Sequence, residues 1–151
     1  MHEMALAEGV LGVVLQAGDG QLVRRVSLRV GTLLMVVPDS FSFSFELAAQ
    51  GSVAEGAILD IAETPARLRC KQCQSSSVFE RPPYICTQCG SVDMEVESGD
   101  ELIVEAVELH DGRIIRQREV PASELLAEHM KEHAADDHEF RSPHVAPPTE
   151  R

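Results

Sequence analysis

The stretch that decides the fold runs from residue 70 to residue 89 and reads CKQCQSSSVFERPPYICTQC. It contains two Cys-x-x-Cys motifs separated by twelve residues. Each motif directs two thiolates toward one point, and two such motifs joined by a loop close a tetrahedron. Zn2+ suits this set because it is a d10 ion that accepts four thiolates without geometric penalty. We predict a structural zinc ion bound by Cys70, Cys73, Cys86 and Cys89.

Two other arrangements of the four cysteines stay open, namely a pair of disulfides or an iron–sulfur cluster. Cytosolic thiols stay reduced, which favours a metal over disulfides. The sequence predicts a cytoplasmic protein because it begins without the basic region and cleavage site of a signal peptide. Its longest apolar run, LLMVV at 33–37, is far shorter than the roughly 20 residues of a membrane-spanning helix.

Outward from the cysteines, hydrophobic periodicity predicts helices and strands. Apolar residues at spacings of three and four predict a helix over 4–17, and its two glycines, Gly9 and Gly12, indicate close packing against a neighbour. Alternation predicts a strand over 23–31 with arginines on its outer face, and a second strand over 57–63. Two further strand-like stretches flank the Ser-Gly-Asp turn at 98–100.

The pattern FSFSF at 41–45 supports two interpretations. Its strict alternation is typical of a strand. However, Phe41, Phe45 and the alanines at 48–49 lie at helical spacing, Pro38 with Asp39 resembles a helix start, and Gly51 resembles a stop. The local pattern leaves both structures open.

The charge of the chain argues against nucleic acid and anionic membranes as partners. The formal net charge is −12, whereas binding to phosphates depends on Lys and Arg. The cysteine-rich segment carries a local excess of basic residues, but four thiolates on Zn2+ offset most of it, and Tyr84 and Phe79 form a thin stacking platform. One function that the sequence leaves open is therefore a zinc-ribbon module for nucleic-acid or protein interaction, with no role for a second metal.

The first three residues, Met1-His2-Glu3, can chelate one metal ion. The Met1 amine, the His2 backbone amide and the His2 imidazole form fused rings, with the amide or carboxylate of Glu3 next in reach. This mostly nitrogen set suits square-planar Ni2+ or Cu2+ better than Zn2+. The other interpretation is a solvated terminal histidine beside an acid that complements the helix dipole.

The order of these features resembles the HypA/HybF family of nickel-insertion accessory proteins. The resemblance rests on MHE followed by a helix, a strand-glycine-VxP turn into a Phe-containing segment, the paired Cys-x-x-Cys motifs, and the GDEL turn at 99–102. It implies an α+β fold in which two helices pack on a small three-stranded sheet with an inserted four-Cys zinc ribbon, and it makes 41–45 helical. It also implies that Met1, His2 and Glu3 form the nickel site.

The resemblance further implies a division of the chain. Residues 1–63 and 98–118 would form a discontinuous nickel-binding domain, 64–97 the zinc ribbon, and 119–151 an acidic, partly disordered tail. The implied function is a non-enzymatic nickel metallochaperone that carries exchangeable Ni2+ to [NiFe]-hydrogenase. The implied partners are a HypB-type GTPase and the hydrogenase large subunit, or urease accessory proteins. Monomer and homodimer both stay open.

The tail after about residue 118 lies outside the usual length of the family. On a short helix, His129 and His133 would share one face, and with His138 they could hold a metal weakly. The spacing HMKEH also matches one class of metalloprotease motif. A short acidic tail offers no third ligand in a walled cavity, so we expect no protease activity. A solvated tail is the simpler interpretation.

Overall fold

The computed structural model describes residues 2–116, and side chains from Glu3 onward. The tail, with the short helix considered for His129 and His133 and with His138, lies outside these residues. The elements in chain order are α1 (His2–Gly18), β1 (Val23–Gly31), the short helix η1 (Thr32–Leu34), α2 (Pro38–Ala49), β2 (Ile58–Thr64), β3 (Ala66–Cys70), β4 (Ser76–Phe79), β5 (Met94–Ser98), β6 (Leu102–Leu109) and β7 (Ile114–Arg116). No helix in this part is long and apolar enough to span a membrane.

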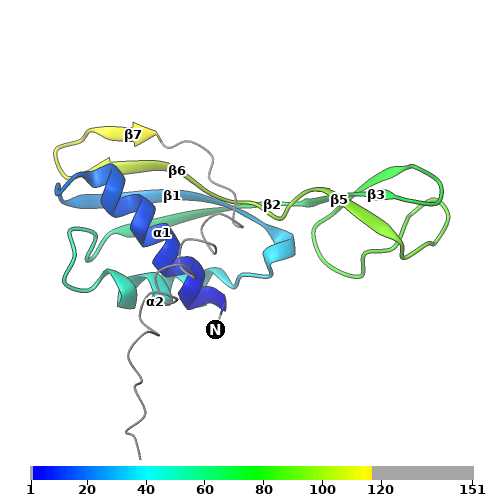
Figure 1. Cartoon of the computed structure of the whole chain (residues 1–151), viewed down its shortest axis with the longest axis horizontal. Coiled ribbons are helices and arrows are strands. Elements are labelled where there is room, and N and C mark those ends of the chain that lie inside the picture. The colour runs from blue at the N-terminus through cyan, green and yellow to red at the C-terminus, as the bar shows by residue number, and fades with distance from the viewer. Residues whose placement is uncertain (1, 117–151) are drawn as a thin grey trace, which may run out of the picture.

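The larger sheet has the order β2-β1-β6-β7. Strands β1 and β2 run parallel, joined through α2, whereas β6 is antiparallel to both β1 and β7. Both helices lie on one face of this sheet (Figure 1). The α+β class is therefore confirmed, but the sheet has four strands rather than three. The extra strand, β7, spans only three residues, too few for a recognisable alternation.

One apolar core lies between the helices and this sheet. Strand β1 contributes alternate residues, and α1 contributes a stripe at helical spacing, as the sequence predicts. The central buried side chains are Leu6, Val10, Val14, Val26, Leu28, Phe41, Phe45, Leu102, Val107 and Leu109.

The FSFSF pattern forms the middle of α2, so the helical interpretation is confirmed. Phe41 and Phe45 are fully buried, whereas Phe43 is 61% exposed. A strand would place all three rings on one face. Pro38 begins the helix, where a missing N–H costs nothing.

The expectation that the glycines of α1 mark close packing is wrong for Gly12. This residue is exposed, and an added Cβ would have no neighbour within 4 Å. The core-facing stripe of α1 is made by Leu6, Val10 and Val14 instead.

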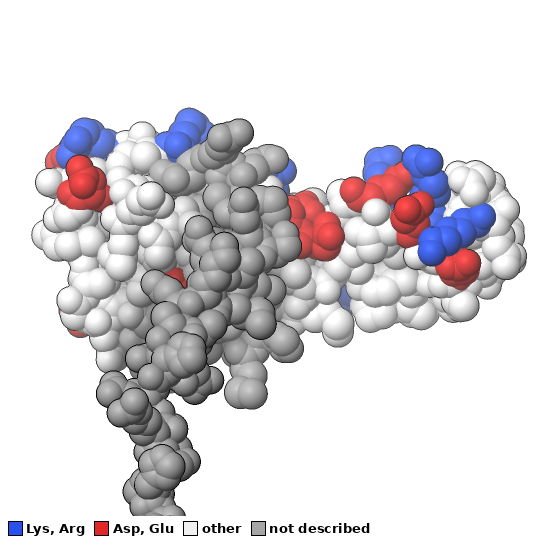
Figure 2. Space-filling view, viewed as in Figure 1, with Lys and Arg blue, Asp and Glu red and all other residues white. Residues whose placement is uncertain are grey.

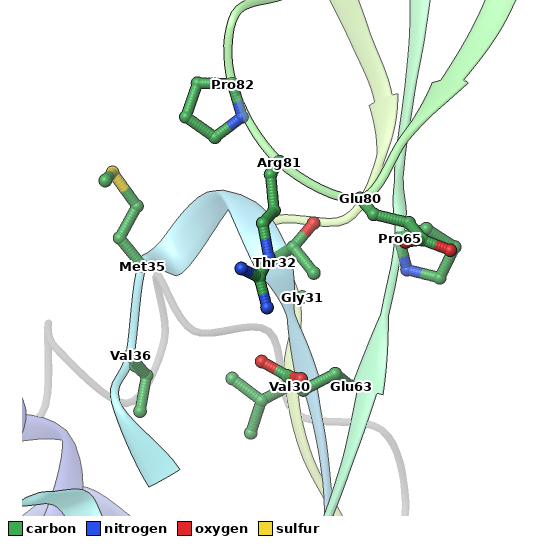
Figure 3. A pocket seen from close by; sticks show the side chains of 10 residues that line it. All are labelled: Val30, Gly31, Thr32, Met35, Val36, Glu63, Pro65, Glu80, Arg81 and Pro82. Atoms are coloured by element: carbon green, nitrogen blue, oxygen red, sulfur yellow. The ribbon is translucent and has the colours of Figure 1, made fainter.

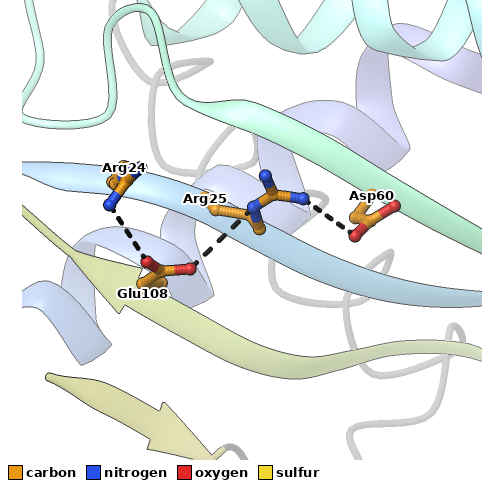
Figure 4. Close-up of polar contacts among 4 residues, drawn as sticks. All are labelled: Arg24, Arg25, Asp60 and Glu108. Atoms are coloured by element: carbon orange, nitrogen blue, oxygen red, sulfur yellow. Dashed lines mark hydrogen bonds and ion pairs between the residues drawn. The ribbon is translucent and has the colours of Figure 1, made fainter. Parts of the chain in front are cut away.

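The opposite face of the sheet carries ion pairs between strands (Figure 4). Arg25 on β1 lies 3.1 Å from Asp60 on β2 and 3.9 Å from Glu108 on β6, and Arg24 lies 3.6 Å from Glu108. Exposed pairs of this kind each stabilise a fold by about 1 kcal/mol at most. Their effect is to keep the open face polar, with the predicted arginines matched by acids.

The cysteine-rich segment forms a second sheet with the order β4-β3-β5, inserted between β2 and β6. It projects from the end of the larger sheet (Figure 1). Where the two units meet, the backbones are tightly packed: a Cβ on Gly31 would lie 2.1 Å from the Gly99 carbonyl oxygen, and a Cβ on Gly99 would lie 2.5 Å from the Ala66 Cα. The Leu33 N–H also donates to the Gly99 carbonyl at 2.9 Å. These contacts fix the direction in which the ribbon leaves the sheet.

Candidate metal centres

The four predicted cysteines meet at one point in the ribbon. Their sulfur atoms all lie within 4.8 Å of one another, and the Cys70–Cys89 and Cys73–Cys86 pairs are 3.5 Å apart. A zinc ion bonded to four sulfurs at about 2.3 Å would hold them roughly 3.8 Å apart. The cluster therefore fits a tetrahedral thiolate-bound ion with little adjustment.

Both Cys-x-x-Cys turns have the same backbone hydrogen bonds. The N–H of Cys70 donates to Ser75, and the N–H of Gln74 donates back to the Cys70 carbonyl; Cys86 makes the equivalent pair with Ser91 and Gly90. The fourth residue after each leading cysteine has a positive φ, 61° at Gln74 and 74° at Gly90. The two turns are thus copies of one local structure, which is why the pair of motifs converges on one point.

A serine that the sequence analysis missed lies within this cluster. The Ser75 hydroxyl is 2.9 Å from the sulfur of Cys73 and 3.4 Å from that of Cys86. The Ser75 hydroxyl and the backbone N–H groups of Cys89 and Gln88 lower the pKa of Cys86 to about 6. Although a hydrogen bond from Ser91 opposes it, contact with the Cys70 thiol and burial raise the pKa of Cys89 to about 12. The metal-free thiols therefore ionise unequally.

The surface of the ribbon bears on the nucleic-acid alternative. Its basic side chains lie beside acidic ones (Figure 2), with Arg69 2.6 Å from Glu97 and Lys71 3.5 Å from Asp93. The rings of Phe79 and Tyr84 pack edge to face on each other, 5.7 Å between centroids. Paired charges and mutually packed rings make a poor surface for phosphates and bases.

The other candidate centre begins at the first helix. The backbone of His2 starts α1, Glu3 is in the first turn, and Met1 lies outside the described residues. The Glu3 carboxylate contacts α2: its Oε1 accepts a hydrogen bond from the Val37 N–H at 3.0 Å, and its Oε2 accepts one from the Ser40 hydroxyl. These bonds, that from Ser40 first, hold the pKa of Glu3 below its ordinary value.

This arrangement differs from the simpler interpretation of Glu3 as an acid that complements α1. The N-cap position of α2 is Val37, whose side chain makes no capping hydrogen bond. The Glu3 carboxylate, on the neighbouring helix, accepts from the N–H of this N-cap residue, as the acid of a capping box does, and places a negative charge at the positive end of α2. Nothing local in the sequence signals the contact, because 37 residues separate Glu3 from Ser40.

A cleft of about 420 Å³ lies where the ribbon meets the larger sheet (Figure 3). Thr32 and Met35 line it on one side and Arg81 and Pro82 on the other, with Glu63 nearby. The Arg81 side chain extends into the cleft in Figure 3. Among the described residues, however, only the four cysteines bring three or more metal-ligating side chains together.

Comparisons with known proteins agree with this architecture. A family model described as hydrogenase/urease nickel incorporation, metallochaperone, hypA matches residues 1–109. The hydrogenase maturation factor HypA of Streptomyces avermitilis is 45% identical over 129 residues, covering 82% of this chain and 98% of that protein. The same factor from Trichormus variabilis is 37% identical over 111 residues, covering 74% and 97%.

A solved structure supports the fold. The solution structure of the Ni metallochaperone HypA from Helicobacter pylori superposes with a TM-score of 0.52 at 24% identity, covering 71% of this chain and 96% of that one. The family match spans both helices, the ribbon and strands β1, β2 and β6 of the larger sheet, and ends before β7. The chain therefore belongs to the HypA family of nickel-incorporation metallochaperones, which act in hydrogenase maturation.

Proposed function

We propose that this chain binds the Ni2+ it carries at its N-terminus, through the Met1 amine, the backbone amide and imidazole of His2, and Glu3. The observation that carries this proposal is that α1 begins at His2. The first four N–H groups of an α-helix have no acceptor within the helix. The amides of His2 and Glu3 are therefore left for another partner, and a mostly nitrogen set suits Ni2+.

The contacts of Glu3 favour one of its two possible ligand atoms. Both carboxylate oxygens already accept hydrogen bonds from α2. We therefore assign the Glu3 backbone amide, rather than its carboxylate, to the nickel. These nitrogen ligands must lose protons to bind, so nickel affinity falls as the pH is lowered. Such a site can take up and release its cargo.

The four-cysteine cluster is proposed to hold a resident Zn2+. A complete shell of four thiolates leaves no open position for chemistry, so the role is structural. The bound ion supplies the cross-link that orders residues 64–97, while residues 1–63 and 98–118 form the nickel-binding domain. The separation of the two units in Figure 1 supports independent loading of the two metals.

The proposed setting is the cytoplasm, where thiolate ligands stay reduced. The proposed partners are a HypB-type GTPase and the large subunit of a [NiFe]-hydrogenase, with urease accessory proteins as further recipients. The family match to hydrogenase and urease nickel incorporation supports this set. In this setting the chain transfers nickel and performs no catalysis of its own.

Nickel titration of two histidine variants tests the N-terminal site. We expect His2→Ala to abolish nickel binding at the N-terminus, where the wild type is proposed to hold an exchangeable ion. His110→Ala is the matched control, because His110 is the other histidine within residues 2–116 and is exposed. Zinc content should stay at one ion per chain in all three proteins. Equal nickel affinity in wild type and His2→Ala would overturn the proposal.

A truncation tests the tail. A chain that ends at Arg118 lacks His129, His133 and His138. We expect it to keep the N-terminal nickel site. Unchanged nickel stoichiometry and affinity would leave the tail histidines without a nickel role, whereas loss of the N-terminal site would show that the tail supplies nickel ligands.

A further inference from the structure

We infer that Ser40, on α2, is a positioning residue of the N-terminal nickel site. It acts through the carboxylate of Glu3, to which its hydroxyl donates. The inference rests on the proposed N-terminal site and adds a second element of the fold to it. The start of α1 lies against the start of α2, where Glu3 meets Val37 and Ser40.

The contact is directed and uses both carboxylate oxygens. The Ser40 hydroxyl donates to Oε2 and the Val37 N–H donates to Oε1. Two donors on two oxygens fix both the position and the rotation of a carboxylate, whereas one donor would leave it free to turn. Val37 is the N-cap of α2 and Ser40 lies in its first turn, which is anchored to the core by the fully buried Phe41.

Ser40 is itself held in place by its neighbours. Its carbonyl accepts a hydrogen bond from the Ser44 hydroxyl at 3.0 Å, and Ser44 is buried. The Val37 carbonyl accepts the first helical hydrogen bond of α2, from the Phe41 N–H at 2.9 Å. The two donors are therefore in place before any metal binds, and their hydrogen bonds hold the Glu3 carboxylate in one orientation.

Chain ends normally fray, and a metal site built from the first three residues must be ordered when the ion binds. Anchoring Glu3 to α2 removes part of that cost, because the backbone next to the ligand atoms is already held. Residues that orient the ligands of a metal typically change its affinity by 10–100-fold when they are removed. The Ser40 hydroxyl is one of the two donors in this anchor, so we expect an effect at the lower end of that range.

Three variants of the full-length, zinc-loaded protein test the inference by nickel titration. We expect Ser40→Ala to weaken nickel binding on the order of tenfold, and Ser40→Thr, which keeps the hydroxyl, to restore it. Ser42→Ala is the matched control, because Ser42 lies on the same helix and makes no side-chain hydrogen bond to another described residue. The visible absorption of bound Ni2+ should shift in Ser40→Ala alone.

The readouts separate positioning from a purely structural role. If Ser40 only caps α2, Ser40→Ala lowers the melting temperature and leaves nickel affinity and the Ni2+ spectrum unchanged, which overturns the inference. Equal weakening by Ser42→Ala also overturns it. Failure of the N-terminal site itself is recognised differently, because His2→Ala would then bind nickel like the wild type. If His2→Ala loses nickel while Ser40→Ala does not, only the role of Ser40 is wrong.

Discussion

Glu3 on α1 caps α2 through Val37, whose N–H donates to the Glu3 carboxylate at 3.0 Å. The valine at the N-cap position has no side chain that can accept from the helix, so the acid of another element supplies the charge. The contact joins the beginning of the chain to the segment that follows β1. It gives Glu3 a structural role in addition to its proposed place in the nickel site.

The stability of the metal-free protein should therefore depend on Glu3. Replacing a capping acceptor by alanine typically costs about 1 kcal/mol. We expect Glu3→Ala to lower the free energy of unfolding in urea by about this amount. Glu46→Ala is the control, since Glu46 is an exposed acid in the last turn of α2, the helix that Glu3 caps. Equal midpoints for Glu3→Ala and the wild type would contradict the capping role.

The junction between sheet and ribbon should not tolerate a side chain at Gly31. Its φ of −70° suits any residue, so the close approach of Gly99, 2.1 Å from an added Cβ, is what requires glycine. We expect Gly31→Ala to destabilise the protein by about 2 kcal/mol or more. Gly12→Ala should do the opposite and stabilise by up to about 1 kcal/mol, because α1 gains helix propensity without a clash. Thermal unfolding measures both, and a tolerated Gly31→Ala would show that the two backbones separate easily.

The Ser75 hydroxyl should control when the thiols of the metal-free cluster ionise. Because it is the main cause of the lowered pKa of Cys86, about 6 against an ordinary 9.0, Ser75→Ala should raise that pKa. At pH 7 the variant then has less thiolate, and zinc binding should weaken more at pH 6 than at pH 8. Thiolate absorbance near the ultraviolet edge follows the titration of reduced, metal-free protein. Superimposed curves for variant and wild type would remove the role of Ser75.

Removal of zinc should unfold the ribbon and spare the larger sheet. The buried hydrophobic side chains of the ribbon are Ala66, Leu68, Cys70 and Cys86, of which two are proposed ligands. The larger sheet has its own core with both helices. In an amide NMR spectrum recorded with a strong chelator, we expect signals of 64–97 to collapse toward unfolded positions while those of β1 and β6 persist. A ribbon that keeps its dispersed signals would be stabilised by something other than the metal.

Local sequence patterns predict most of the helices and strands of this fold. The segments that they leave open or predict wrongly can be explained by the structure. The alternation of Val26, Leu28 and Val30 predicts β1 because one face of the sheet is buried. The FSFSF pattern stays ambiguous by itself because Phe43 puts an apolar ring on the exposed face of the helix, and this ring completes an alternation that is equally typical of a strand. The glycine at position 12 looks like a packing contact in the sequence, yet it faces open space.

The residues of the candidate metal centres also differ in how far they can be predicted from local sequence. The four cysteines can be recognised because each turn depends on residues within five positions of its leading cysteine. Ser75 lies inside one of these turns, so a hydroxyl two residues after Cys73 was a signal that could have been read. Ser40 had no such signal, since only the packing of α1 on α2 brings it to Glu3.

Blocking the amine of Met1 tests the central claim most directly, because it leaves every side chain in place. The measurement is nickel titration of the zinc-loaded protein with the Met1 amine acetylated, compared with the unacetylated chain. Acetylation is chosen because an added residue would supply a new amine. We predict that nickel binding at the N-terminus is lost while one zinc ion per chain and the melting temperature are retained. Nickel binding with unchanged affinity and an unchanged Ni2+ spectrum in the acetylated chain would contradict the N-terminal site.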